Sequence, residues 1–142
     1  MRVLGISHVG LAASDVTKAA WFFGTVLGLK NVGNELVAEQ QTMTIMFTAH
    51  SDEGGTADSR LEILEPKGAD GPIAKFLAKR GSGLHHLALI VANLDEALLH
   101  LAGFGVEMID KVPRGGAHKT RIAFVHPRAT GGLLVELVEE LS

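Results

Sequence analysis

Apolar residues in this chain recur with two periods, and each period occurs twice along the sequence. The run over residues 5–13 is rich in Val, Ile and Leu, which predicts a β-strand. Behind it, apolar residues recur at i, i+3, i+4 and i+7, the spacing of one face of a helix. These residues are Ala19, Phe22, Phe23 and Val26. Asp15 is placed to cap this helix and Gly28 to end it.

Three further strands complete the first half of the chain. The pattern predicts them at about residues 32–38, 42–48 and 60–65, the last of them closed by Pro66. Residues 50–59 change in composition to Ser, Asp, Glu and a Gly-Gly pair, which is typical of a loop. The first half therefore has the predicted order βαβββ.

The second half repeats this order after a short linker. Residues 67–71 are polar, Pro72 suits the first turn of a short helix, and Gly-Ser-Gly at 81–83 separates the halves. A strand is then predicted at 84–91, followed by a helix that Asn93 caps, with Glu96 completing a capping box. Apolar positions extend this helix to Leu101, and glycines 103 and 105 end it.

The remaining strands of the second half are predicted at about 106–109, 121–125 and 133–138. Glycine pairs at 115–116 and 131–132 are expected to form turns. We therefore predict an α+β fold of two tandem βαβββ modules. The 142 residues suit a single domain, built of repeats at about 1–66 and 84–142 that a short helical linker joins.

The repeat also places two kinds of polar residue in matching positions. His8 on the first strand aligns with His86, and Glu62 in Leu-Glu-Ile-Leu-Glu matches Glu136 in Val-Glu-Leu-Val-Glu. Two histidines and two glutamates suit a divalent metal such as Mn²⁺, Co²⁺, Ni²⁺, Fe²⁺ or Zn²⁺. The alternative is that the histidines are core residues and the glutamates face solvent, as in many half-exposed strands. The duplication favours the metal.

The other histidines are expected to have structural roles. His85 precedes His86 on a strand, so its side chain should point to the opposite face and pack there. His118 and His126 lie near predicted turns, and His50 and His100 are expected at the surface. The glycine-rich turns lack the motifs that bind phosphate groups.

Composition narrows the class of protein. The formal net charge is −3, with 20% charged and 46% hydrophobic residues. The chain therefore has no basic stripe of the kind that binds nucleic acid. The chain has no cysteine, which excludes disulfides and thiolate ligands. No apolar run reaches the roughly 20 residues that a membrane helix needs. We expect a cytoplasmic protein without nucleic-acid or membrane partners.

Several longer motifs are more specific. They are Gly-Leu-His-His at 83–86, Phe-Val-His-Pro at 124–127 and Gly-Gly-Leu-Leu-Val-Glu-Leu at 131–137, whereas His-Val-Gly at 8–10 is a weak signal. In these motifs the chain resembles the vicinal oxygen chelate superfamily and, within it, the methylmalonyl-CoA epimerase family. The resemblance covers nearly the whole chain. It implies that paired βαβββ modules form a metal-binding cleft, and that the chain assembles as a homodimer.

The resemblance also implies a set of functional residues and a reaction. The implied metal ligands are His8, Glu62, His86 and Glu136, holding Co²⁺, Mn²⁺, Ni²⁺ or Zn²⁺. The implied substrate is an acyl-CoA, whose (R) and (S) methylmalonyl forms interconvert through an enolate. Glu136 is the implied catalytic acid/base. An epimerase needs a second such group, which the alignment would place at Thr44, whose hydroxyl is too weak a base.

Three other functions remain as alternatives. A glyoxalase-type lyase or isomerase uses a similar histidine and glutamate ligand set. A ring-cleaving dioxygenase is disfavoured, because that chemistry prefers two histidines and one carboxylate. The third alternative is a non-catalytic protein that binds a small molecule and holds no tightly bound metal.

Overall fold

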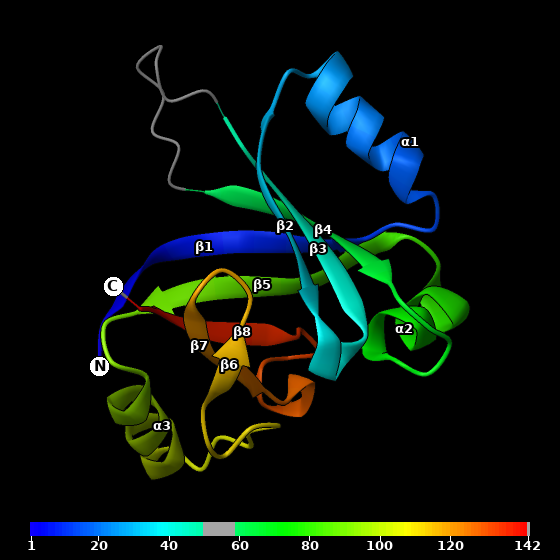
Figure 1. The fold of residues 1–142 in the computed structure, drawn as a ribbon. Helices are drawn as coiled ribbons and strands as arrows, with labels where there is room; N and C mark the ends of the chain where they lie inside the picture. Colours follow the sequence, from blue (N-terminus) through cyan, green and yellow to red (C-terminus); the bar gives the residue numbers. More distant parts are fainter. Residues whose placement is uncertain (50–58, 142) are drawn as a thin grey trace. The chain divides into compact units, whose positions relative to one another are not determined.

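The computed structural model describes residues 1–49 and 59–141, so nearly all of the predicted loop at 50–59, with His50, lies outside the described residues. The chain divides into two compact units, whose helices and strands are labelled in Figure 1. One, here called the N-terminal unit, is His8–His85, and the other, the C-terminal unit, is His86–Ser142 together with Met1–Ser7. The order of strands and helices confirms the two βαβββ modules.

The N-terminal unit contains a mixed sheet. Its strands are β1 (Val3–Ala12, from His8 onward), β2 (Lys30–Val37), β3 (Thr42–Thr48) and β4 (Arg60–Pro66), arranged in the order β2-β3-β4-β1. β1 runs parallel to β4, whereas the β2–β3 and β3–β4 pairs are antiparallel. The first and last strands of this module are therefore neighbours, although the whole module separates them in sequence.

The first helix begins where the sequence predicts but changes its winding. Asp15 caps α1 (Val16–Ala20) by accepting a hydrogen bond from the Lys18 N–H at 3.0 Å. The helix then continues as the π-helix η1 (Trp21–Val26). Its inner side packs on a core of three buried residues from β3 and β4, which are Ile45, Phe47 and Ile63.

The linker helix lies near the other face of β1 and β4. α2 (Pro72–Arg80) begins at the predicted proline and ends at Gly81, whose φ of +73° favours glycine. Ile73, which is 3% exposed, packs against Ala12 and Leu64. The two faces of this sheet therefore contact different helices.

The C-terminal unit repeats the arrangement. Its elements are β5 (Gly83–Val91, from His86 onward), α3 (Leu94–Gly103), β6 (Arg114–Gly116), β7 (Thr120–Val125) and β8 (Val135–Glu140). The strands follow the order β5-β8-β7-β6. β5 is parallel to β8 and the other pairs are antiparallel, so here too the first and last strands of a module are neighbours.

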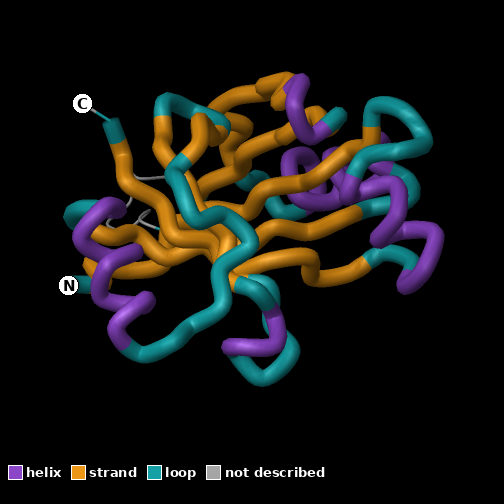
Figure 2. Tube along the Cα trace, turned by 90° about the horizontal axis from the view of Figure 1, so that it is seen from below, coloured by secondary structure: helices purple, strands orange, loops and turns teal. Residues whose placement is uncertain are grey.

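α3 is anchored at its first turn. The Asn93 side chain accepts the Glu96 N–H at 3.0 Å, which confirms the predicted cap. Leu94 and Ala97 are fully buried against Ala123, Val125 and Leu137 of β7 and β8. Helical segments such as this one connect successive strands along the chain (Figure 2).

Two predictions for the second module are wrong. Residues 106–109 form no strand and contribute only an isolated bridge between Met108 and Val125. The Gly115-Gly116 pair is part of β6 and not a turn, because its backbone pairs with Thr120–Ile122 of β7. The turn follows at 117–119, where His118 and Lys119 adopt positive φ values of 56° and 57°. Within the described part of the chain, no helix is long and apolar enough to cross a membrane.

Candidate metal centre

The N-terminal unit brings its predicted histidine and glutamate together. His8 lies on β1 and Glu62 on β4, with 3.6 Å between His8 Nε2 and Glu62 Oε1. Both are buried, at 6% and 5% exposed. The parallel register places Gly10, two residues after His8, opposite Glu62. A glutamate is rarely buried to this degree unless a partner group compensates its charge.

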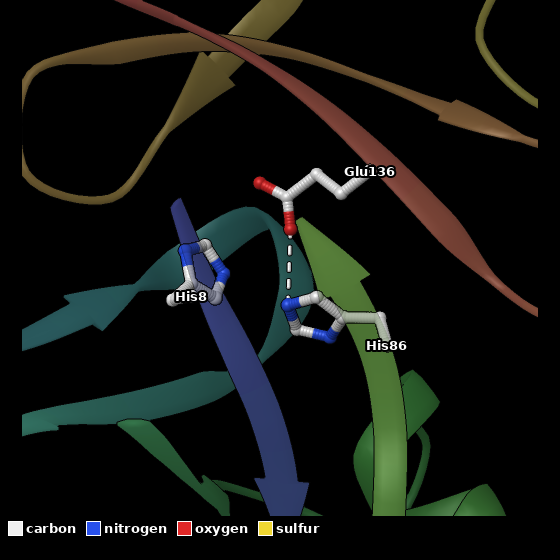
Figure 3. A group of neighbouring side chains, drawn as sticks. All are labelled: His8, His86 and Glu136. Carbon is white, nitrogen blue, oxygen red and sulfur yellow. Dashed lines mark ion pairs between the residues drawn. The ribbon is translucent and has the colours of Figure 1, made fainter. Parts of the chain in front are cut away.

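The C-terminal unit does the same with His86 and Glu136. His86 Nε2 lies 3.0 Å from Glu136 Oε2 (Figure 3), and the two residues are 5% and 6% exposed. Ala88, two residues after His86, is opposite Glu136 across β5 and β8. The two units therefore use the same register to place a histidine beside a glutamate.

Three of the four residues also form a group with metal-ligand spacing. One ligand atom from each of His8, His86 and Glu136 lies within 4.8 Å of the others (Figure 3). His8 directly follows Ser7, the last of the seven N-terminal residues that belong to the C-terminal unit. Among the described residues, Glu62 is not part of this group, although it contacts His8.

The donor set fits a divalent metal. Imidazole nitrogens and carboxylate oxygens are ligands for first-row divalent ions, and the chain has no thiolate to compete. Two carboxylates buried beside imidazoles would also be costly without a compensating positive charge, which a divalent ion supplies.

An aromatic ring supports one of the predicted ligands from the side. The Phe124 ring meets the His86 imidazole edge-on, with centroids 5.8 Å apart. The Arg114 guanidinium lies over the same ring, 5.4 Å from its centroid. Asp110 faces Arg114 Nε at 3.3 Å and accepts the Phe124 N–H at 2.8 Å. This Asp110–Arg114–Phe124 cluster was not predicted, because nothing in the sequence pairs residues from a loop and two strands.

The remaining histidines have other surroundings. The His85 ring packs edge-on against Phe76, with centroids 5.0 Å apart, which agrees with its predicted packing role. His126 Nδ1 accepts the Arg128 N–H at 3.1 Å at the start of a short 3₁₀ turn. Arg128 also donates to Glu107 at 2.9 Å, and this hydrogen bond lowers the pKa of the Glu107 carboxyl below its ordinary value.

Thr44, the position where the resemblance would place a second acid/base, has a structural contact. It is 3% exposed on β3, and its hydroxyl donates a hydrogen bond to the Glu35 carbonyl oxygen at 3.2 Å. This bond ties β3 to β2. A hydroxyl held in this way is also a poor proton donor or acceptor for a substrate.

The family is shown by comparison with known proteins. Residues 7–124 match the model of the glyoxalase/bleomycin resistance protein/dioxygenase superfamily. The chain belongs to this superfamily, and its fold is the vicinal oxygen chelate fold.

Individual relatives are more specific. The chain is 32% identical to the mitochondrial methylmalonyl-CoA epimerase of Bos taurus, over 93% of this chain and 72% of that protein. A solved methylmalonyl-CoA epimerase, in complex with methylmalonyl-CoA and NH4⁺, has a TM-score of 0.90 and 31% identity, covering 99% of this chain and 97% of that one. The uncharacterised protein YqjC of Bacillus subtilis (strain 168) is 41% identical, over 94% of this chain and 91% of its own.

Proposed function

We propose that the protein is a divalent-metal-dependent methylmalonyl-CoA epimerase that interconverts the (R) and (S) forms of its substrate. The observation that carries this proposal is the matched pair of buried contacts, His8–Glu62 and His86–Glu136, at the same register in both modules. The similarity to epimerases over almost the whole chain supports the choice of reaction within the superfamily.

The four residues of these pairs are the proposed metal ligands. His8, Glu62, His86 and Glu136 would hold Co²⁺, Mn²⁺, Ni²⁺ or Zn²⁺, ions that this ligand set does not distinguish. When bound, the ion acts as a Lewis acid that stabilises negative charge on the thioester oxygen. Phe124, with the Arg114 guanidinium over its ring, would hold the His86 imidazole in the orientation that the ligand needs.

Glu136 is the proposed acid/base. Its carboxylate would remove the proton at C2 of one epimer, leaving an enolate, and in its protonated form it would return a proton to the enolate in the reverse direction. Burial to 6% exposure keeps bulk water from this carboxylate. One oxygen of Glu136 can serve as ligand while the other handles the proton.

Two further features belong to the same proposal. The substrate is an acyl-CoA, as in the epimerase solved with methylmalonyl-CoA, and the chain is proposed to form a homodimer. The cytoplasmic location expected from the sequence stays a prediction.

An isotope-exchange experiment tests the reaction. The protein is purified without chelators, its metal content is measured, and each methylmalonyl-CoA epimer is incubated with it in D₂O. We expect a tightly bound divalent metal, conversion of each epimer into the other, and deuterium at C2. Absence of both exchange and epimerisation, with turnover of the methylglyoxal–glutathione hemithioacetal, would instead identify a glyoxalase-type enzyme. Absence of bound metal and of both activities would favour a binding protein.

Substitution of the proposed acid/base gives a more specific prediction. Glu136→Gln keeps the size and most contacts of the side chain, so we expect a folded protein whose epimerisation rate falls by about 10²-fold or more. The control is Glu140→Gln on the exposed end of β8, which should leave the rate unchanged. Wild-type turnover in Glu136→Gln, measured by epimer ratio, would remove Glu136 from this role.

A further inference from the structure

Inversion of a carbon centre by proton transfer requires two groups, one for each face of the planar enolate. Glu136 is one of them in the proposed function, on which this inference rests. Thr44 does not supply the other, because its hydroxyl is bound to a backbone carbonyl. The partner of Glu136 must therefore be sought among the remaining titratable side chains.

The sheet of the N-terminal unit carries two of the proposed ligands, His8 and Glu62, on one face. Residues directly opposite each other on paired strands share a face of the sheet. Met46 is opposite Glu62 across β3 and β4, and Thr44 is two residues from Met46. The side chains of Met46 and Thr44 therefore lie on the same face of the sheet as that of Glu62.

The next strand places a second glutamate on this face. Glu35 of β2 is directly opposite Thr44, and Gly33 is opposite Met46. Over the described residues of these four strands, the titratable side chains on this face are His8, Lys30, Glu35, Arg60 and Glu62. Glu35 is thus the one carboxylate there besides the proposed ligand Glu62.

Glu35 is also within reach of the position that Thr44 occupies. Opposite residues in an antiparallel pair have Cβ atoms about 5 Å apart, and a glutamate side chain extends further than a threonine. Glu35 is partly buried, whereas Glu39, beyond the end of β2, is exposed. The hydrogen bond from Thr44 to the Glu35 carbonyl fixes the backbone from which the carboxylate extends.

We propose that Glu35 is the second acid/base of the epimerisation. In one direction the Glu35 carboxylate takes the C2 proton, and the electron pair of that C–H bond passes into the enolate. Protonated Glu136 then gives its proton to the opposite face of C2. In the other direction the two glutamates exchange roles, so protons and charge balance without a redox partner.

The test uses Glu35→Gln with each epimer separately in D₂O. Loss of one of two bases should lower epimerisation by about 10²-fold or more. One epimer should still exchange its C2 hydrogen for deuterium with retained configuration, because Glu136 remains able to remove and return a proton on its own face. Metal content and thermal unfolding should match the wild type. Glu39→Gln is the matched control, and it should epimerise normally.

Four results would overturn the proposal. Epimerisation by Glu35→Gln at the wild-type rate would show that another group carries the proton. Loss of bound metal, or loss of exchange for both epimers, would assign Glu35 a structural or ligand role. Glu35→Asp, which keeps the carboxylate, should be more active than Glu35→Gln, and equal inactivity of the two would count against a proton-transfer role. A wild-type protein that exchanges neither epimer would refute the proposed function itself.

Discussion

At the scale of single residues, adjacent histidines on one strand have different surroundings. His86 contacts Glu136 and the edge of Phe124, whereas His85 packs on Phe76. Strand alternation accounts for the difference, because successive side chains point to opposite faces. Of these two neighbouring histidines, His86 is therefore the candidate ligand and His85 the packing residue.

This difference gives a matched prediction for metal binding. His86→Ala removes a proposed ligand, so metal affinity should fall by more than the roughly 10- to 100-fold that loss of an outer-shell partner costs. His85→Ala, one residue away, should keep its metal. Metal per chain after dialysis, measured by elemental analysis, distinguishes the two. Equal metal content in both variants would argue against His86 as a ligand.

The sequence alone reveals the metal candidates but not Glu35, for a physical reason. His8 and His86 are recognisable because a duplicated local motif repeats them in register. Glu35 becomes a candidate acid/base only because it is paired with Thr44 across β2 and β3. A bulge between Asn31 and Gly33 shifts the β2–β3 register just before that pair. Register across strands depends on tertiary pairing, which the residues of one strand do not encode.

At the scale of elements, local signals predicted the helix starts well and other features poorly. Asp15 and Asn93 cap their helices as expected, because a cap depends only on residues within one turn. The change from α-helix to π-helix at Trp21 left no mark in the apolar spacing. β6 was missed because two of its three residues are glycines, and its pairing with β7 outweighs their preference for turns.

α3 offers a matched test of which face of a helix stabilises the fold. Leu94 is 0% exposed and packs in the core of the C-terminal unit, whereas Leu99 on the same helix is 77% exposed. Leu94→Ala should lower the free energy of unfolding by about 2–5 kcal/mol through lost packing. Leu99→Ala should change it by less than about 0.5 kcal/mol. Urea denaturation of both variants measures the difference, and equal effects would contradict the described packing.

At the scale of the whole molecule, metal binding should be linked to stability. A ligand that binds only the folded chain adds about 2.7 kcal/mol at a free concentration of 100 times its Kd. Removing the metal with EDTA should therefore lower the Tm by several degrees, and adding back Co²⁺ or Mn²⁺ should restore it. Scanning calorimetry provides the measurement, with Mg²⁺ as the comparison ion. An unchanged Tm in a sample shown to have lost its metal would show that metal binding does not stabilise the fold.

The shared register of the two modules has an evolutionary consequence. Each module holds one histidine and one glutamate on neighbouring parallel strands, placed by the same two-residue offset. Two copies of a single ancestral module, each with one histidine and one glutamate, would therefore already have supplied all four residues as separate chains. Duplication and fusion of that module within one gene would have kept the four residues and allowed each copy to change independently. Glu35 and the Asp110–Arg114–Phe124 cluster lie in one copy each, so the two copies differ outside the shared set of histidines and glutamates.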